Sequence, residues 1–178
     1  MTALANPGSA AVRRAPPAVA AAAAEPSLVL TFLLGGELFG ITIRTIKEII
    51  EYRVPTEVPA MPAAVLGVIN LRGAVVPVMD LQARLGRPAA VVGRRTCIVI
   101  VEVGDGEEAL TVGIVVDAVS EVLEIPPEDV EPPPSFGARV AAEFIAGMGK
   151  VRGRFVILLD VARVLAVGVP AEALAAVS

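Results

Sequence analysis

The chain contains the segment Gly67-Val-Ile-Asn-Leu-Arg-Gly-Ala-Val-Val-Pro-Val-Met-Asp-Leu-Gln-Ala-Arg-Leu85. A diverged copy follows as Gly147-Met-Gly-Lys-Val-Arg-Gly-Arg-Phe-Val-Ile-Leu-Leu-Asp-Val-Ala-Arg-Val-Leu165. The first glycine, the Arg-Gly dipeptide, a valine, an aspartate and the final leucine coincide. In each copy, apolar runs flank the Arg-Gly dipeptide, which is typical of two strands joined by a tight turn. The aspartate that follows is expected to cap a short helix.

A second repeat lies upstream of each of these segments. The stretch Gly40-Ile-Thr-Ile-Arg-Thr-Ile-Lys-Glu-Ile-Ile50 matches Gly113-Ile-Val-Val-Asp-Ala-Val-Ser-Glu-Val-Leu123 in its glycine, its first isoleucine and its glutamate. The segments that begin at Gly67 and Gly147 are spaced further apart than this upstream pair, and the extra residues fall in the Pro-rich stretch 126–137. Ordered internal matches of this kind indicate a duplication. We place the copies at about 28–90 and 95–167.

Each copy predicts the same secondary structure. Residues 28–34 and 38–43 read as a hairpin, and residues 97–103 and 109–116 are its counterpart. The apolar residues that follow have helical spacing and predict a short helix in each copy; they are Ile43, Ile46, Ile49 and Ile50, and then Val116, Val119, Val122 and Leu123. Many short strands with little helix favour an all-β protein of two small barrels. A unit of this size is marginal alone, so the copies are expected to pack together.

Composition excludes several classes of protein. The chain is 55% hydrophobic, but its longest uncharged runs, 15–24 and 58–71, are short and interrupted by proline. We therefore expect no membrane insertion. The net charge is −4 and aromatic residues make up only 3%, which argues against a nucleic-acid surface.

Histidine is absent from the whole chain, so neither Ser-His nor Cys-His catalysis can be assembled and no histidine can bind a metal. The only cysteine, Cys97, lies in an apolar run and is expected to be a small buried hydrophobe. A single cysteine makes no intramolecular disulfide. We expect no metal and no cofactor.

The ends of the chain differ from its centre. Residues 1–27 are rich in Ala and Pro without periodicity, which predicts a disordered leader. Residues 168–178 are taken as a C-terminal tail.

The paired aspartates Asp80 and Asp160 allow one catalytic reading. Two equivalent carboxylates in a duplicated β-protein could share a proton, as in a carboxylate-dependent hydrolase. Aspartic proteases carry the paired aspartates in Asp-Thr-Gly loops, and this loop is absent at both Asp80 and Asp160. Capping of the helix that follows is the simpler role for each aspartate.

Several motifs together resemble one known family. They are Leu34-Gly-Gly-Glu-Leu-Phe-Gly-Ile-Thr-Ile43, Gly67-Val-Ile-Asn-Leu-Arg-Gly73, Val75-Val-Pro-Val-Met-Asp80 and Val112-Gly-Ile-Val-Val-Asp117. In this order, over roughly residues 28–165, they resemble the bacterial chemotaxis coupling protein CheW. The resemblance implies a pair of packed five-stranded SH3-like β-barrels without enzymatic activity. It also implies a cytoplasmic adaptor in receptor arrays, monomeric when free, which links the tips of chemoreceptors to the regulatory domain of the histidine kinase CheA.

The resemblance also assigns residues. A receptor-binding groove between the barrels is implied at Ile43, Ile46, Val119 and Val122, together with the charged pair Glu48 and Arg72. A kinase-binding edge is implied at Tyr52, Val54 and Pro55. The family often has Arg where this chain has Gln82.

Three alternatives stay open. The chain could serve a non-flagellar chemosensory pathway such as pilus motility, because the motifs do not distinguish these systems. It could be the hydrolase described above. It could also be a detached relative of the kinase's regulatory domain.

Overall fold

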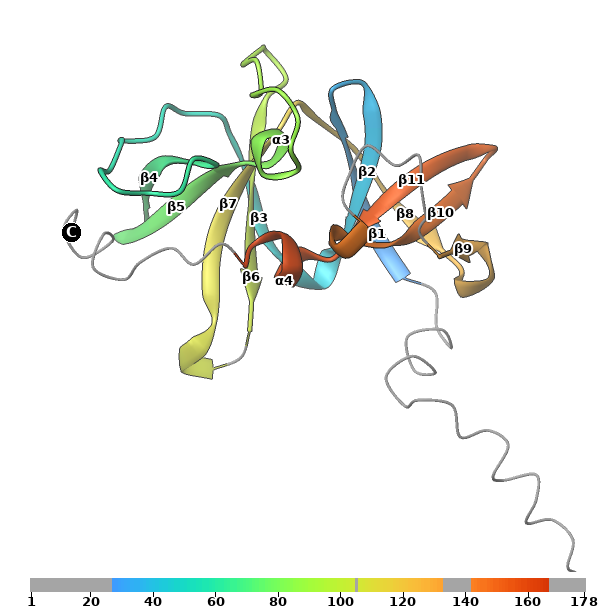
Figure 1. Cartoon of the computed structure of the whole chain (residues 1–178). Helices are drawn as coiled ribbons and strands as arrows, with labels where there is room; N and C mark the ends of the chain where they lie inside the picture. Colours follow the sequence, from blue (N-terminus) through green and yellow to red (C-terminus); the bar gives the residue numbers. More distant parts are fainter. Residues whose placement is uncertain (1–26, 105, 133–141, 167–178) are drawn as a thin grey trace, which may run out of the picture.

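The computed structural model describes residues 27–104, 106–132 and 142–166, which form two packed β-barrels with a few short helices (Figure 1). The expected all-β fold is thus confirmed. The expected leader 1–27 except for Ser27, the expected tail 168–178, and residues 133–137 of the Pro-rich stretch lie outside the described residues.

Two sheets build the barrels, and we call them sheet A and sheet B. Sheet A has the strand order β8-β1-β2-β11-β10-β9 and sheet B the order β3-β6-β7-β5-β4. The strands of sheet A are β1 (Ser27–Leu34), β2 (Glu37–Thr42), β8 (Ala118–Ile125), β9 (Val130–Glu131), β10 (Ile145–Val151) and β11 (Arg154–Leu159). Those of sheet B are β3 (Ile46–Glu51), β4 (Val65–Leu71), β5 (Ala74–Asp80), β6 (Cys97–Val103) and β7 (Leu110–Val116). The helical turns are η2 (Ile43–Thr45), α3 (Leu81–Arg84), η3 (Gly106–Glu108), η4 (Pro127–Asp129), η5 (Ala142–Phe144) and α4 (Val161–Val164).

The two sequence copies exchange their N-terminal hairpins. The hairpin β1–β2 of the first copy lies in sheet A, where β1 pairs with β8 and β2 pairs with β11 of the second copy. In turn, the hairpin β6–β7 of the second copy lies in sheet B, where it pairs with β3 and β5 of the first copy. Each barrel therefore contains strands of both copies, and separating the copies would break strand pairs in both sheets.

The larger hydrophobic core lies where the two sheets meet. It joins buried side chains of sheet A, such as Phe32 and Phe39, to those of sheet B, such as Val99 and Ile114. The two phenylalanine rings stack with centroids 6.3 Å apart. Fully burying a side chain of this size stabilises a fold by about 1.5–3 kcal/mol. We call this cluster the seam core. A smaller cluster, which includes Ile69 and Val78, consists of buried side chains from the strands of sheet B.

The predicted helices after the N-terminal hairpins are mostly wrong. In the first copy only η2, Ile43–Thr45, is helical, and Ile46–Glu51 forms strand β3; in the second copy Ala118–Ile125 is strand β8 throughout. Both segments are rich in Ile and Val, whose branched side chains favour strands. Each segment also finds a partner in the other copy's hairpin, β6 for β3 and β1 for β8. Long-range pairing thus overrides a local helical pattern.

The turns and caps of the duplicated segments agree with the sequence. The two hairpins β4–β5 and β10–β11 turn at the Arg-Gly dipeptides, as expected. The carboxylate of Asp80 accepts hydrogen bonds from the backbone N–H groups of Gln82 and Ala83, and that of Asp160 accepts one from Arg163. Both aspartates therefore cap the short helices that follow.

Two further expectations concern the burial of Cys97 and the insertion of the chain into a membrane. Cys97 is half-buried rather than buried, and its thiol donates a hydrogen bond to the carbonyl oxygen of Arg95 at 3.3 Å. In the part of the chain that the structure describes, no helix has the length and apolar character needed to span a bilayer.

Candidate functional site

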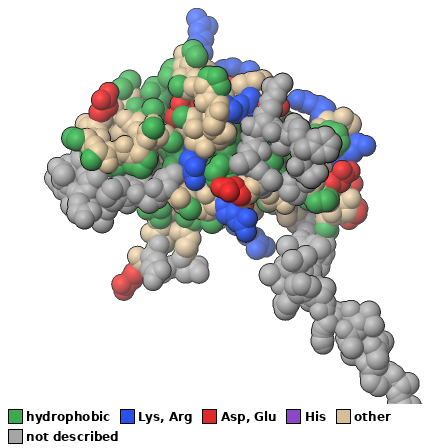
Figure 2. Space-filling model, viewed as in Figure 1, with side chains coloured by type: hydrophobic (Ala, Val, Ile, Leu, Met, Phe, Trp, Pro, Cys, Tyr) green, Lys and Arg blue, Asp and Glu red, His purple; other side chains and the backbone are tan. Residues whose placement is uncertain are grey.

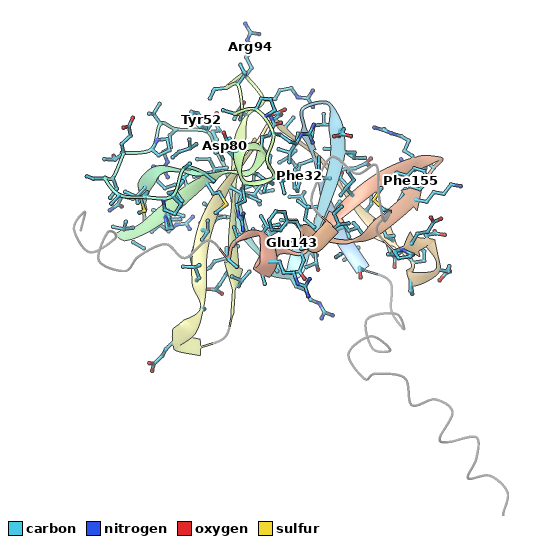
Figure 3. The ribbon with its side chains drawn as sticks, viewed as in Figure 1. Phe32, Tyr52, Asp80, Arg94, Glu143 and Phe155 are labelled. Atoms are coloured by element: carbon cyan, nitrogen blue, oxygen red, sulfur yellow. The ribbon has the colours of Figure 1, made fainter. Side chains whose placement is uncertain are left out.

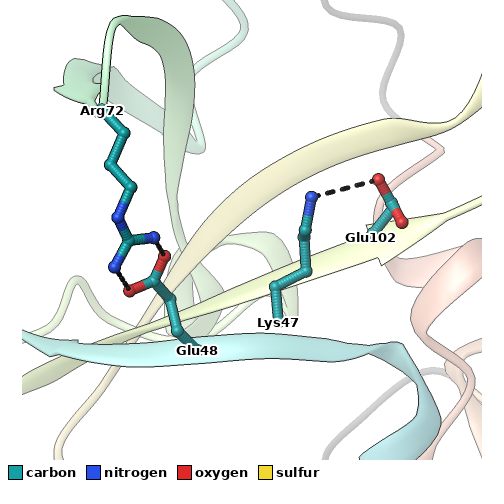
Figure 4. A network of polar contacts seen from close by, with 4 residues as sticks. All are labelled: Lys47, Glu48, Arg72 and Glu102. Carbon is teal, nitrogen blue, oxygen red and sulfur yellow. Dashed lines mark hydrogen bonds and ion pairs between the residues drawn. The ribbon is translucent and has the colours of Figure 1, made fainter.

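An exposed ion pair marks one face of sheet B (Figure 4). Glu48 lies on β3, and Arg72 lies in the turn between β4 and β5. Nη2 of Arg72 donates to Oε1 of Glu48 at 3.0 Å, and Nη1 donates to Oε2, so the guanidinium binds the carboxylate through both oxygens. The Arg72 side chain is 75% exposed and the Glu48 side chain is 25% exposed. An ion pair with one partner this exposed contributes only about 0–1 kcal/mol to stability.

The backbone holds Arg72 in an uncommon conformation. Its φ is 53° and that of Gly73 is 85°, and Arg152 and Gly153 repeat these values at 51° and 78°. Positive φ at both central residues defines a type I′ turn, which suits the twist of a hairpin. Glycine adopts positive φ readily, whereas an arginine does so rarely. The turn directs Arg72 toward β3.

A surface cavity of about 430 Å³ lies beside the ion pair. Its lining combines Glu48 and Arg72 with apolar residues of β5, including Val75 and Pro77. Lys47, which also lines it, forms a second exposed ion pair with Glu102 at 3.4 Å. The face thus offers charged groups around a shallow apolar floor, a composition suited to a protein partner.

Three of the four apolar residues assigned to the receptor groove pack at the junction of the barrels. Ile43, Ile46 and Val119 are half-buried and pack against the seam core. Val122 on β8 is 53% exposed. Three of the four residues therefore meet at one core cluster although they come from both copies, whereas Val122 is not among the residues that pack against it.

The junction itself contains a second cavity of about 560 Å³. Thr42, Arg44 and Thr45 beside Ile43 line it on one side, and Leu158 and Asp160 line it on the other. Residues of β2, η2, β6, β11 and α4 thus face a common hollow between the sheets.

The residues assigned to the kinase-binding edge differ in exposure. Tyr52 is half-buried against the smaller core, Val54 is 82% exposed, and Pro55 is buried. Thr56, which follows them, forms a β-bridge with Val68 of the edge strand β4. Val54 is therefore the residue of the three that presents an exposed apolar side chain, whereas the buried Pro55 does not reach the surface.

The carboxylates of Asp80 and Asp160 already have partners. Asp80 is 3% exposed, and besides capping α3 its Oδ2 accepts a hydrogen bond from Ala90 N–H at 3.0 Å. Asp160 forms an ion pair with Arg163 at 3.6 Å. These contacts account for both aspartates as structural groups. Among the described residues, no cluster of three or more Cys, Asp or Glu side chains could hold a metal ion.

Sequence reasoning missed a set of polar contacts between the barrels. The amide of Gln82 donates to Asp117 at 3.3 Å, and the same carboxylate accepts the backbone N–H of Gly35 at 2.8 Å. Arg87 forms an ion pair with Glu37 at 2.8 Å. These contacts join α3 to the β1–β2 turn. Nothing in the local sequence signals them, because their members are far apart along the chain.

Comparison with known proteins places the chain in a family. Residues 28–168 match the model of the CheW-like domain. The chain is 35% identical over 136 residues to the chemotaxis protein CheW of Klebsiella aerogenes, which covers 76% of this chain and 80% of the relative. It is 36% identical to CheW of Rhizobium meliloti over 74% of this chain and 83% of the relative.

A further relative and a solved structure agree. The chain is 32% identical to protein FrzA of Myxococcus xanthus, over 76% of this chain and 82% of FrzA. The crystal structure of scaffolding protein TtCheW from Thermoanaerobacter tengcongensis superposes with a TM-score of 0.69 at 30% identity, over 83% of this chain and 88% of that one. The chain therefore belongs to the CheW-like domain family.

Proposed function

We propose that this chain is a non-enzymatic adaptor of chemotaxis signalling that couples chemoreceptors to the histidine kinase CheA. Family membership over nearly all of the folded region is the observation that carries this proposal. The exposed, doubly bonded Glu48–Arg72 pair supports it, because such a pair adds little stability and presents charge to a partner. The chain acts in the cytoplasm, as a monomer when free and within receptor arrays when assembled.

The receptor tip is proposed to lie in the groove between the barrels. Ile43, Ile46 and Val119 are half-buried against the seam core, and Val122 is the most exposed of the four apolar residues that we assign to this groove. Glu48 and Arg72 supply the charged rim. Aliphatic anchors surrounded by polar groups are typical of stable protein interfaces.

The kinase's regulatory domain is proposed to bind the edge of sheet B. Val54 is the apolar anchor there, and Tyr52 and Pro55 set its position. This edge and the groove use different residues, so one chain can hold a receptor and a kinase at once. That property is what a coupling protein requires.

Titration calorimetry tests the proposal with the purified full chain, a receptor tip fragment and the kinase regulatory domain. Saturable binding to each fragment alone, and of both together, is expected. Arg72→Ala should weaken receptor binding, whereas Val54→Ser should weaken kinase binding. A chain that binds neither fragment at high protein concentration would contradict the proposal.

A second candidate is an adaptor of another chemosensory pathway. Its support is the match to protein FrzA, which covers as much of this chain as the matches to CheW proteins do but is not named a CheW protein. Parallel titrations with receptors and kinases from each pathway of one cell decide between the two, because the cognate pair binds more tightly.

A further inference from the structure

The two copies are joined by an exposed loop, residues 86–96, between α3 and β6. We call it the linker loop. It rises above α3 at the top of Figure 1, and its C-terminal end lies beside Tyr52, because Cys97 after the loop pairs with Glu51. Figure 3 labels Arg94 at its tip, where the side chain points away from both sheets.

Two adjacent valines of the linker loop are exposed. Val91 is 84% exposed and Val92 is 51% exposed. A single exposed apolar residue needs no explanation. Two neighbouring β-branched residues at the tip of a projecting loop form a small apolar contact surface, and burying them against a partner removes this area from water.

The same loop is locally basic on an acidic chain. The whole chain has a net charge of −4, yet no Asp or Glu occurs between residues 81 and 101. Arg94 and Arg95 are both exposed, and neither forms a salt bridge with any residue that the structure describes. In Figure 2 a basic side chain projects at the top of the molecule with hydrophobic surface below it. Charge of this sign favours a negative partner.

The linker loop is held in place at both ends of this surface. Before Val91, the N–H of Ala90 donates to the buried carboxylate of Asp80 at 3.0 Å. After Val92, the N–H of Gly93 donates to Oγ1 of Thr96 at 2.7 Å, and the N–H of Thr96 donates to the carbonyl of Gly93 at 3.3 Å. Ordering a loop on binding costs affinity, and these contacts reduce that cost.

We propose that the linker loop docks an acidic segment of another protein, with an apolar side chain of that segment seated on Val91 and Val92 and its carboxylates paired with Arg94 and Arg95. Two arginines are too few for an anionic membrane surface, which usually takes clusters of about 4–8 basic residues. The loop has no aromatic side chain on which a nucleic-acid base could stack. The proposal uses none of the residues that are assigned to the receptor and kinase surfaces.

Fluorescence anisotropy tests it with the full chain and a labelled synthetic peptide in which glutamates flank two leucines. The peptide is expected to bind saturably and to lose affinity as salt is raised. The double variant Arg94→Gln/Arg95→Gln should bind about three- to tenfold more weakly, since exposed ion pairs are individually modest. Val91→Ser/Val92→Ser should show a similar loss.

The matched control is Arg154→Gln/Phe155→Ser on β11. It removes an exposed arginine and an exposed apolar side chain outside the linker loop, so peptide affinity should not change. Peptides with Gln for Glu, or Ser for Leu, should bind poorly. The absence of saturable binding, equal loss in the control, or binding to anionic vesicles but not to the peptide would each overturn the proposal.

Discussion

The two halves of the duplication keep the same turn but use it differently. Arg72 and Arg152 share nearly the same φ and both face a glutamate of the strand that follows the first hairpin of their copy. Arg72 binds Glu48 through both carboxylate oxygens, whereas Arg152 lies 4.0 Å from Glu121, whose side chain is 51% exposed. The fold therefore does not require the tight pair. The contact through both carboxylate oxygens is therefore a feature of the first copy alone.

The glycines at the start of the duplicated segments should show the largest difference. Gly67 has a φ of 153°, and an added Cβ would fall on the carbonyl group of Thr56, whereas a Cβ at Gly147 would meet mainly the tip of Val130. Gly67→Ala should cost about 3–4 kcal/mol, and Gly147→Ala about 1 kcal/mol, by urea unfolding. Equal losses would mean that Thr56 moves aside easily.

The capping aspartates should differ next. Asp80 is buried and accepts three backbone N–H groups, whereas Asp160 accepts one and lies closer to solvent. Asp80→Ala should cost about 3 kcal/mol, because it removes a cap and leaves an N–H group without a partner. Asp160→Ala should cost about 1 kcal/mol. Chemical denaturation of both variants measures this, and a larger loss at Asp160 would contradict the comparison.

The arginines should separate binding from stability. Arg72→Ala should weaken the receptor complex about tenfold, or about 1.4 kcal/mol, and leave the free energy of unfolding within about 1 kcal/mol of the parent. Arg152→Ala is the matched control and should leave receptor affinity within about twofold. Calorimetric titration and thermal melting of both variants provide the two readouts. Equal receptor binding by Arg72→Ala and the parent would remove the role given to the pair.

The turns themselves should give the smallest effect. Asparagine tolerates positive φ better than arginine, so Arg152→Asn should stabilise the fold by about 0.5 kcal/mol. Arg72→Asn should stabilise the fold by less, because this substitution also removes the ion pair with Glu48. The difference in Tm between the two variants reports what that ion pair contributes to folding. A larger gain at Arg72 would show that the pair strains the turn.

Local signals predicted much of the fold. The N-terminal hairpins, the Arg-Gly turns and the aspartate caps depend on residues close together in sequence, and all are confirmed. The helical reading of Ile43 to Ile50 was wrong beyond Thr45, since apolar residues at that spacing also satisfy a strand once a partner strand is available. Glu48 and Arg72 were paired only through the family resemblance, and Gln82 gave no signal of its contact with Asp117.

The sequence by itself determined that the chain is duplicated, rich in short strands and without histidine chemistry, because repeats, turn residues and composition are local properties. Only the tertiary structure decided that the copies exchange hairpins, that Gly67 must approach Thr56, and that Arg72 rather than Arg152 holds its glutamate tightly. These outcomes depend on which distant strands pair and on how closely the side chains then approach one another. Hydrophobic periodicity along one chain does not contain that information.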